Sequence, residues 1–212
     1  MGRLGLCALS FAAAVAITAA QSQPPAADLA RQLQARYDTV KTFTADLTVS
    51  QQSGGVPQAK VAHGTVKVMK PGRINFATAA PDESQIVSNG SELISWTGTK
   101  QADRTHLSSD DRSTIMMLLA GRADLNRDFT PSLGPQTSET EWSLTLTPKS
   151  VQNDFASLTL LVDRRTLALD GYATADNTGG HVTVRFTNLK ENVPLKDGDF
   201  TFNHSGVKIV DR

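Results

Sequence analysis

The sequence predicts a mainly β fold of the α+β class, in which an antiparallel sheet or barrel carries helices on one side. Short segments along most of the chain alternate apolar and polar residues, as half-buried strands do. Clusters of Gly, Pro, Asn and Asp separate these segments at intervals of roughly 8–12 residues, which gives about ten strands. Two stretches with a helical pattern lie among them. Alternation alone leaves open whether the interior is packed or hollow.

The N-terminus has the pattern of a cleaved signal peptide. Arg3 provides a short positive start, residues 4–16 form an apolar run, and small residues at 18–20 precede Gln21. A retained membrane anchor is the alternative, although the run is short for a membrane span. We expect residues 1–20 to be the signal peptide, 21–27 a Pro/Ala linker and 28–212 a single domain.

Charge and cysteine content narrow the function classes. The chain has 21 Lys and Arg against 21 Asp and Glu, so it offers no electrostatic basis for binding nucleic acid. Its one cysteine, Cys7, lies in the predicted signal peptide. The mature part is therefore expected to have no disulfide, no thiolate metal site and no cysteine nucleophile.

Two helices are expected. The first covers residues 29–41 with Asp28 as its N-cap, and its buried face is an apolar stripe of Leu29, Leu33, Tyr37 and Val40. The second covers residues 114–120, with Ser113 as its cap and Gly121 as its end. This second helix is apolar all round, so it must be buried against an apolar surface. Its two methionines favour a surface that repacks around varying shapes, and the alternative is a plain core helix.

Turn signals are densest in residues 70–96, where Pro71-Gly72, Pro81-Asp82 and Asn89-Gly90 separate short strands. Asn89-Gly90 is a strong hairpin signal, because Asn and Gly both tolerate positive φ. Residues 121–141 are long and poorly patterned, and we expect a mobile loop there. Residues 200–202 and 207–210 are expected to form a last pair of short strands.

Residues with catalytic or metal-binding chemistry are scattered. The four histidines, His63, His106, His181 and His204, stand alone without ligand spacing, and no Gly-x-Ser-x-Gly elbow exists. Asp82-Glu83 and Asp110-Asp111 are interpreted as solvated loop charge. We therefore expect no enzyme, no metal and no cofactor. A metal site assembled across strands and a Ser–His hydrolase are the alternatives.

Several pieces, in order and at consistent spacing, resemble one family over nearly the whole mature chain. They are RYDTVKT at 36–42, FTAD at 43–46, GTVKVMKPGR at 64–73, PDES at 81–84, IVSNG at 86–90, LLAG at 118–121, LTLTP at 144–148, DNTGGHVTVRFTN at 176–188, FTF at 200–202 and GV at 206–207. The chain resembles the LolA family, the periplasmic outer-membrane lipoprotein carrier proteins of Gram-negative bacteria.

The resemblance implies a curled, unclosed antiparallel β-barrel with a lid of short α-helices over an apolar cavity. It implies a periplasmic carrier that takes triacylated lipoproteins from an inner-membrane ABC lipoprotein-release complex and passes them to an outer-membrane lipoprotein acceptor. We expect it to act as a monomer. The alternative function is a LolA-like sensor module that binds a lipid or a lipoprotein without transporting it.

Alternation and the resemblance together nominate a cavity lining. The candidates are Leu47, Val49, Val66, Val68, Ile74, Phe76, Trp96, Met117, Leu118 and Phe186. For each of them the alternative is an ordinary core position. Lys70 is the candidate lid contact, because it stands where the family usually has an arginine that holds the lid by hydrogen bonds. Lysine keeps the charge of arginine but lacks its planar fork.

Overall fold

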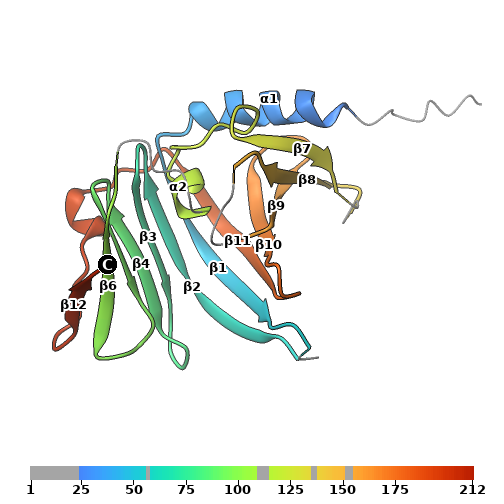
Figure 1. Cartoon of the computed structure of the whole chain (residues 1–212). Helices are drawn as coiled ribbons and strands as arrows, with labels where there is room; N and C mark the ends of the chain where they lie inside the picture. The colour runs from blue at the N-terminus through green and yellow to red at the C-terminus, as the bar shows by residue number, and fades with distance from the viewer. Residues whose placement is uncertain (1–23, 56–57, 109–114, 135–137, 151–154) are drawn as a thin grey trace, which may run out of the picture.

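The computed structural model describes residues 24–55, 58–108, 115–134, 138–150 and 155–212. Its strands form one sheet in the order β12-β6-β5-β4-β3-β2-β1-β11-β10-β9-β8-β7. The sheet curls around an apolar interior, and its two edge strands, β12 and β7, lie on opposite sides of the molecule (Figure 1). The mainly β, curled and unclosed architecture predicted from the sequence is therefore confirmed.

The elements follow one another with short connections. The helices are α1 (Ala26–Asp38), α2 (Ile115–Leu119) and the 3-10 helix η1 (Asp197–Phe200). The strands are β1 (Thr42–Gln52), β2 (Lys60–Met69), β3 (Arg73–Thr78), β4 (Ser84–Asn89), β5 (Glu92–Trp96), β6 (Gln101–His106), β7 (Phe129–Leu133), β8 (Glu141–Pro148), β9 (Ser157–Asp163), β10 (Leu169–Ala175), β11 (His181–Glu191) and β12 (Lys208–Asp211).

Antiparallel pairing dominates the sheet. Strands β1 to β6 form one meander and β7 to β11 another, and β1 joins them by pairing with both β2 and β11. One pair departs from the expectation, because β12 runs parallel to β6. The chain leaves β11, passes through η1 and adds β12 beside β6 as an edge strand of the sheet.

Two segments differ from the sequence prediction. The expected mobile loop at 121–141 contains β7, which pairs with β8. Pro131 gave the segment a loop-like sequence pattern, because proline lacks the N–H that a strand donates to its neighbour. Proline is nevertheless tolerated in an edge strand such as β7, where that N–H would face away from the sheet. Residues 200–202 are not a strand, since Phe200 ends η1 and the chain beyond it is irregular.

Helix α1 crosses one end of the sheet and contacts β7 and β8. It begins earlier than expected, with Pro25 at its N-cap, so Asp28 is not the cap but a first-turn acid paired with Arg31. Leu29 and Leu33 are buried as the stripe predicted.

Helix α2 lies inside the curl of the sheet (Figure 1). All five of its residues are buried, which confirms that this apolar segment is an internal helix. Gly121 follows it with φ of +76°, the left-handed conformation expected of a C-terminal glycine. The expected cap Ser113, residue 114 and the pair Asp110-Asp111 lie outside the described residues.

The hairpin between β4 and β5 forms as its turn signal predicted. Gly90 has φ of +101°, and the Asn89 side-chain oxygen accepts hydrogen bonds from the backbone N–H groups of Ser91 and Glu92 at 2.9 and 3.0 Å. These bonds replace ladder bonds at the tip of the hairpin.

Within the described part of the chain, no helix is long and apolar enough to span a membrane. In the same residues, no group of three or more His, Cys, Asp or Glu side chains is arranged to hold a metal ion.

Candidate functional site

The concave face of the sheet is the candidate site. Residues that pair across antiparallel strands point to the same side of a sheet. Leu47 pairs with Phe186, Val66 with Phe76, and Val68 with Ile74. These six side chains, with Val49 beside them, therefore form one apolar surface that spans β11, β1, β2 and β3.

Helix α2 covers this surface. Met117 and Leu118 belong to the same apolar cluster as the strand residues. Val66, Val68, Ile74 and Met117 are 0% exposed, so the covered part of the face is inaccessible to solvent. Nine of the ten predicted lining residues are thus brought together in one cluster or packed against it.

The cover is incomplete. A hollow of about 340 Å³ opens on the concave face near the β1–β2 and β3–β4 turns, with Val49, Ala62 and Phe76 among its lining residues. Polar and charged groups also line it, namely Gln51, Lys60, Thr78, Asp82, Glu83, Ser84 and Thr97. The end of α2 is held at the opposite ends of these strands, because the Gly72 N–H donates to the Ala120 carbonyl there at 2.9 Å.

Trp96 is the exception among the predicted lining residues. Ile86 pairs with Phe76 and therefore lies on the concave face. Its neighbour Gln85 points to the opposite side, because successive residues of a strand alternate. Trp96 pairs with Gln85, so it points to the convex side as well. Its ring packs against Phe202 and His204 of the C-terminal segment, with centroids 6.1 and 4.0 Å away. This corrects the expectation for Trp96, which belongs to a second, smaller core beneath that segment.

Lys70 lies at the junction of α1, the sheet and α2. Its ammonium nitrogen is 3.1 Å from the centre of the Tyr37 ring and donates a hydrogen bond to the Tyr37 carbonyl. Burial is the main cause that lowers the pKa of Lys70 to about 8, and the nearby Asp38 carboxylate opposes it. The stem of Lys70 passes beside Gly121, since a Cβ on that glycine would lie 2.7 Å from Lys70 Cδ.

Tyr37 connects this junction to α2. Its hydroxyl donates a hydrogen bond of 2.5 Å to the carbonyl of Leu119, the last residue of α2. Burial, with a smaller contribution from Glu191, raises the pKa of the Tyr37 hydroxyl well above its usual range, so it stays a neutral donor. The sequence interpretation placed Tyr37 only in the apolar stripe of a helix, where its hydroxyl carried no separate signal.

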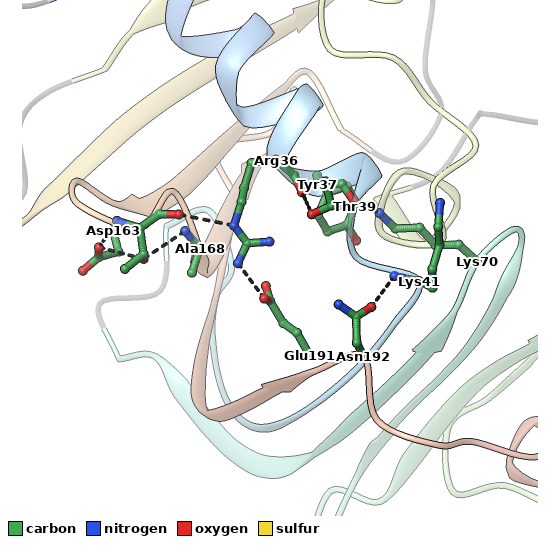
Figure 2. Close-up of polar contacts among 10 residues, drawn as sticks. Arg36, Tyr37, Thr39, Lys41, Lys70, Asp163, Ala168, Glu191 and Asn192 are labelled. Carbon is green, nitrogen blue, oxygen red and sulfur yellow. Dashed lines mark hydrogen bonds and ion pairs between the residues drawn. The ribbon is translucent and has the colours of Figure 1, made fainter.

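The last turn of α1 and the segment that follows it are both anchored (Figure 2). Arg36 pairs with Glu191 at 2.5 Å and donates to the Thr166 carbonyl at 3.3 Å. The backbone N–H of Lys41 donates to the Asn192 side chain at 2.8 Å. These contacts to β11 and its surroundings fix the position from which Tyr37 reaches α2.

Arg122 holds the segment that leaves α2. Its guanidinium donates to the Gly90 carbonyl in the β4–β5 turn and, at 2.9 Å, to the Ser108 carbonyl after β6. Sequence reasoning missed this residue, because an arginine after a helix end has no pattern that distinguishes a tether from a solvated charge.

Comparison with known proteins agrees with this geometry. A family model described as "Outer membrane lipoprotein carrier protein LolA" matches residues 38–203. The match covers most of the 212-residue chain, including β1 to β11 and α2. The chain therefore belongs to the LolA family of outer-membrane lipoprotein carrier proteins.

Individual relatives extend the similarity over the chain. An outer-membrane lipoprotein carrier protein from Chromohalobacter salexigens is 27% identical, over 92% of this chain and 91% of that protein. A protein of the same name from Cupriavidus taiwanensis is 27% identical, over 92% of each chain. Among solved structures, an uncharacterized conserved protein from Thermus thermophilus has the same fold, with a TM-score of 0.52 and 14% identity over 86% of this chain and 99% of that one.

Proposed function

We propose that this protein is a periplasmic carrier that binds the acyl chains of lipoproteins on its concave face and delivers them to the outer membrane. The observation that carries the proposal is a curled apolar face covered by a short helix without a polar side. Membership of the LolA family supports it. A carrier of this kind needs a binding surface and a cover, and no catalytic group.

The physical need for a cover follows from the cargo. Each methylene exposed to water costs roughly 0.8 kcal/mol, so an acyl chain does not cross an aqueous compartment unshielded. The hollow beside Val49 and Phe76 is the proposed entry, and the covered residues Val66, Val68 and Ile74 are the proposed deeper lining, made available when α2 moves. Leu47, Phe186, Met117 and Leu118 complete the proposed lining.

Delivery requires release as well as binding. A lid held by a few hydrogen bonds can open without unfolding the sheet. The polar contacts of α2 and the residues after it to Tyr37, Gly72 and Gly90 are of this kind. Met116 and Met117 give the lid flexible side chains that adapt to different acyl shapes. Lys70 is the proposed lid contact.

The proposed partners are triacylated lipoproteins, an inner-membrane ABC lipoprotein-release complex and an outer-membrane acceptor. The names of the relatives support the lipoprotein and the outer membrane as destination. Residues 1–20 are the proposed signal peptide for export, and the carrier is proposed to act as a monomer.

A release assay tests the proposal. Purified protein is incubated with spheroplasts that hold a newly made triacylated lipoprotein, and the supernatant is assayed for a soluble one-to-one complex. Release of the lipoprotein supports the carrier. Folded protein that releases nothing, beside an active control carrier, contradicts it and favours a sensor without transport.

Two neighbouring substitutions make the assay specific for the concave face. Val49→Glu places a carboxylate in the hollow, whereas Ser50→Glu places the same charge one residue further on, on the opposite face of β1. Val49 and Ser50 are both only partly buried, so both variants should fold. We expect at least roughly tenfold less release for Val49→Glu, because apolar chains then pack against a charged carboxylate. Equal release by both variants would place the cargo elsewhere.

A further inference from the structure

The last carbonyl groups of α2 are satisfied from outside the lid. Inside the helix and its exit, the carbonyls of Met116, Met117 and Leu118 accept from the N–H groups that follow them. The next carbonyl, Leu119, accepts from the Tyr37 hydroxyl. Ala120 accepts from the backbone N–H of Gly72. Unpaired carbonyls at a helix end need such partners, so lifting α2 breaks both of these bonds.

Lys70 reaches the lid by two routes of different kinds. Its aliphatic stem passes beside Gly121. Its ammonium group contacts Tyr37 in two ways, through the bond to the Tyr37 carbonyl and through its position over the ring. The charge of Lys70 therefore acts on the residue that holds α2, and not on α2 itself.

We propose that Tyr37 is the positioning residue of the closed lid, and that the Lys70 ammonium acts on the lid through it. This inference rests on the proposed function, since it concerns the lid of the same site. The Tyr37 hydroxyl fixes α2, the Lys70 ammonium fixes the Tyr37 ring, and Arg36 with Glu191 fixes the helix turn that carries Tyr37. Tyr37 and Lys70 thus act together to hold the lid closed, and this pair is called the lid device.

Ring packing supports the assignment. The Tyr37 ring lies 6.3 Å from the Phe43 ring at 57°, so its orientation is set on the apolar side by β1 and on the polar side by Lys70. A ring held from two sides keeps its hydroxyl aimed at one acceptor.

Thiol labelling in the absence of cargo tests the device. Because Cys7 is the one cysteine of the sequence, a Cys7→Ser, Met117→Cys protein carries a single thiol, on the lid helix α2 at a position that is fully buried when the lid is closed. Its alkylation by a water-soluble maleimide measures how often the lid opens. Tyr37→Phe removes one hydrogen bond from the closed state, so we expect labelling about three- to tenfold faster. An unchanged rate would overturn the inference.

The second tyrosine of the chain provides the matched control. Tyr172 is buried in β10 with its ring 6.2 Å from Phe186, and among the described residues it makes no hydrogen bond to α2. Tyr172→Phe should leave the labelling rate unchanged. If it accelerates labelling as much as Tyr37→Phe does, the effect is general loosening of the core and the inference fails.

A double-mutant cycle tests whether Lys70 acts on α2 through Tyr37, which we call the relay, or by direct contact with α2. Lys70→Met should accelerate labelling in the Tyr37 background but add nothing in the Tyr37→Phe background, because the link to Leu119 is then already broken. Independent, multiplying effects would show that Lys70 acts on α2 directly and would overturn the relay. Circular dichroism and urea unfolding confirm that each variant is folded.

The labelling readout needs no lipid or lipoprotein. A protein that fails the release assay but shows the expected labelling retains the lid device without the carrier function. If the protein releases lipoprotein but the labelling rate is the same with Tyr37 and with Tyr37→Phe, the carrier function holds and the lid device does not.

Discussion

At the scale of single residues, Lys70 shows how burial and contact set the properties of a side chain. Its ammonium group lies over the Tyr37 ring. Two carboxylates, Asp38 and Glu191, and two cations, Lys41 and Arg36, act on its charge. Burial is the largest cause acting on it and disfavours the ammonium form. The folded protein therefore binds the Lys70 proton less tightly than the unfolded chain does.

This shift predicts a pH dependence of stability. Below about pH 8 Lys70 is charged in both states, and the folded protein bears the cost of the buried charge. As the pH rises from about 8 toward the ordinary value of 10.5, the folded state loses the proton first, and the cost is relieved. The free energy of unfolding of the wild type should therefore rise relative to that of Lys70→Met.

Urea unfolding of both proteins at about pH 7 and about pH 9.5 measures this difference while staying below the ordinary pKa of tyrosine. A constant difference between the two proteins across this range would contradict the account of Lys70. A fall in the relative stability of the wild type would contradict it as well.

The contacts of individual side chains could be predicted from the sequence only in part. The family resemblance nominates Lys70 as a lid contact, whereas nothing in the sequence nominates Tyr37 for such a role. An aromatic residue in an amphipathic stripe is explained completely by burial, so its hydroxyl gives no separate sequence signal. The partner of that hydroxyl is the Leu119 carbonyl, which is 82 residues away along the chain.

At the scale of elements, α2 is defined by how it ends. Gly121 adopts φ of +76° directly beside the stem of Lys70, so both backbone conformation and space favour glycine there. Gly55 has nearly the same φ, +78°, but a Cβ on it would meet nothing within 4 Å. Comparing substitutions at the two glycines therefore separates the cost of backbone strain from the cost of steric crowding.

Alanine at these two positions gives a prediction about packing at the end of α2. Gly55→Ala should lower the free energy of unfolding by roughly 1–2 kcal/mol through strain alone. Gly121→Ala should cost measurably more, because its Cβ also displaces the Lys70 side chain that Tyr37 holds. Urea unfolding of both variants measures the costs, and equal values would show that Lys70 moves aside freely.

Strand faces show what periodicity can and cannot predict. Alternation correctly grouped Leu47 with Val49, and Val66 with Val68, because those strands bury one face more than the other. It failed for Trp96, because alternation does not say which face looks inward. The convex side there has its own core, where Val87, Trp96 and Phe200 are 2%, 7% and 2% exposed.

At the scale of the whole molecule, the sheet is curled but unclosed. Turn residues and alternation were enough to predict an antiparallel sheet with added helices. The hollow could not be predicted from the sequence alone. It depends on where α2 lies inside the curl of the sheet and on how much of the concave face α2 covers. Packed and hollow interiors use the same alternating strands.

Photo-cross-linking shows whether acyl chains lie on the concave face. A photoreactive phenylalanine analogue is placed at Val49 or at Ser50, and each protein is loaded with a lipoprotein labelled with tritiated palmitate. We expect position 49 to cross-link to the labelled acyl chains and position 50 not to do so. Cross-linking at position 50 alone, or at neither position in a soluble complex, would contradict it.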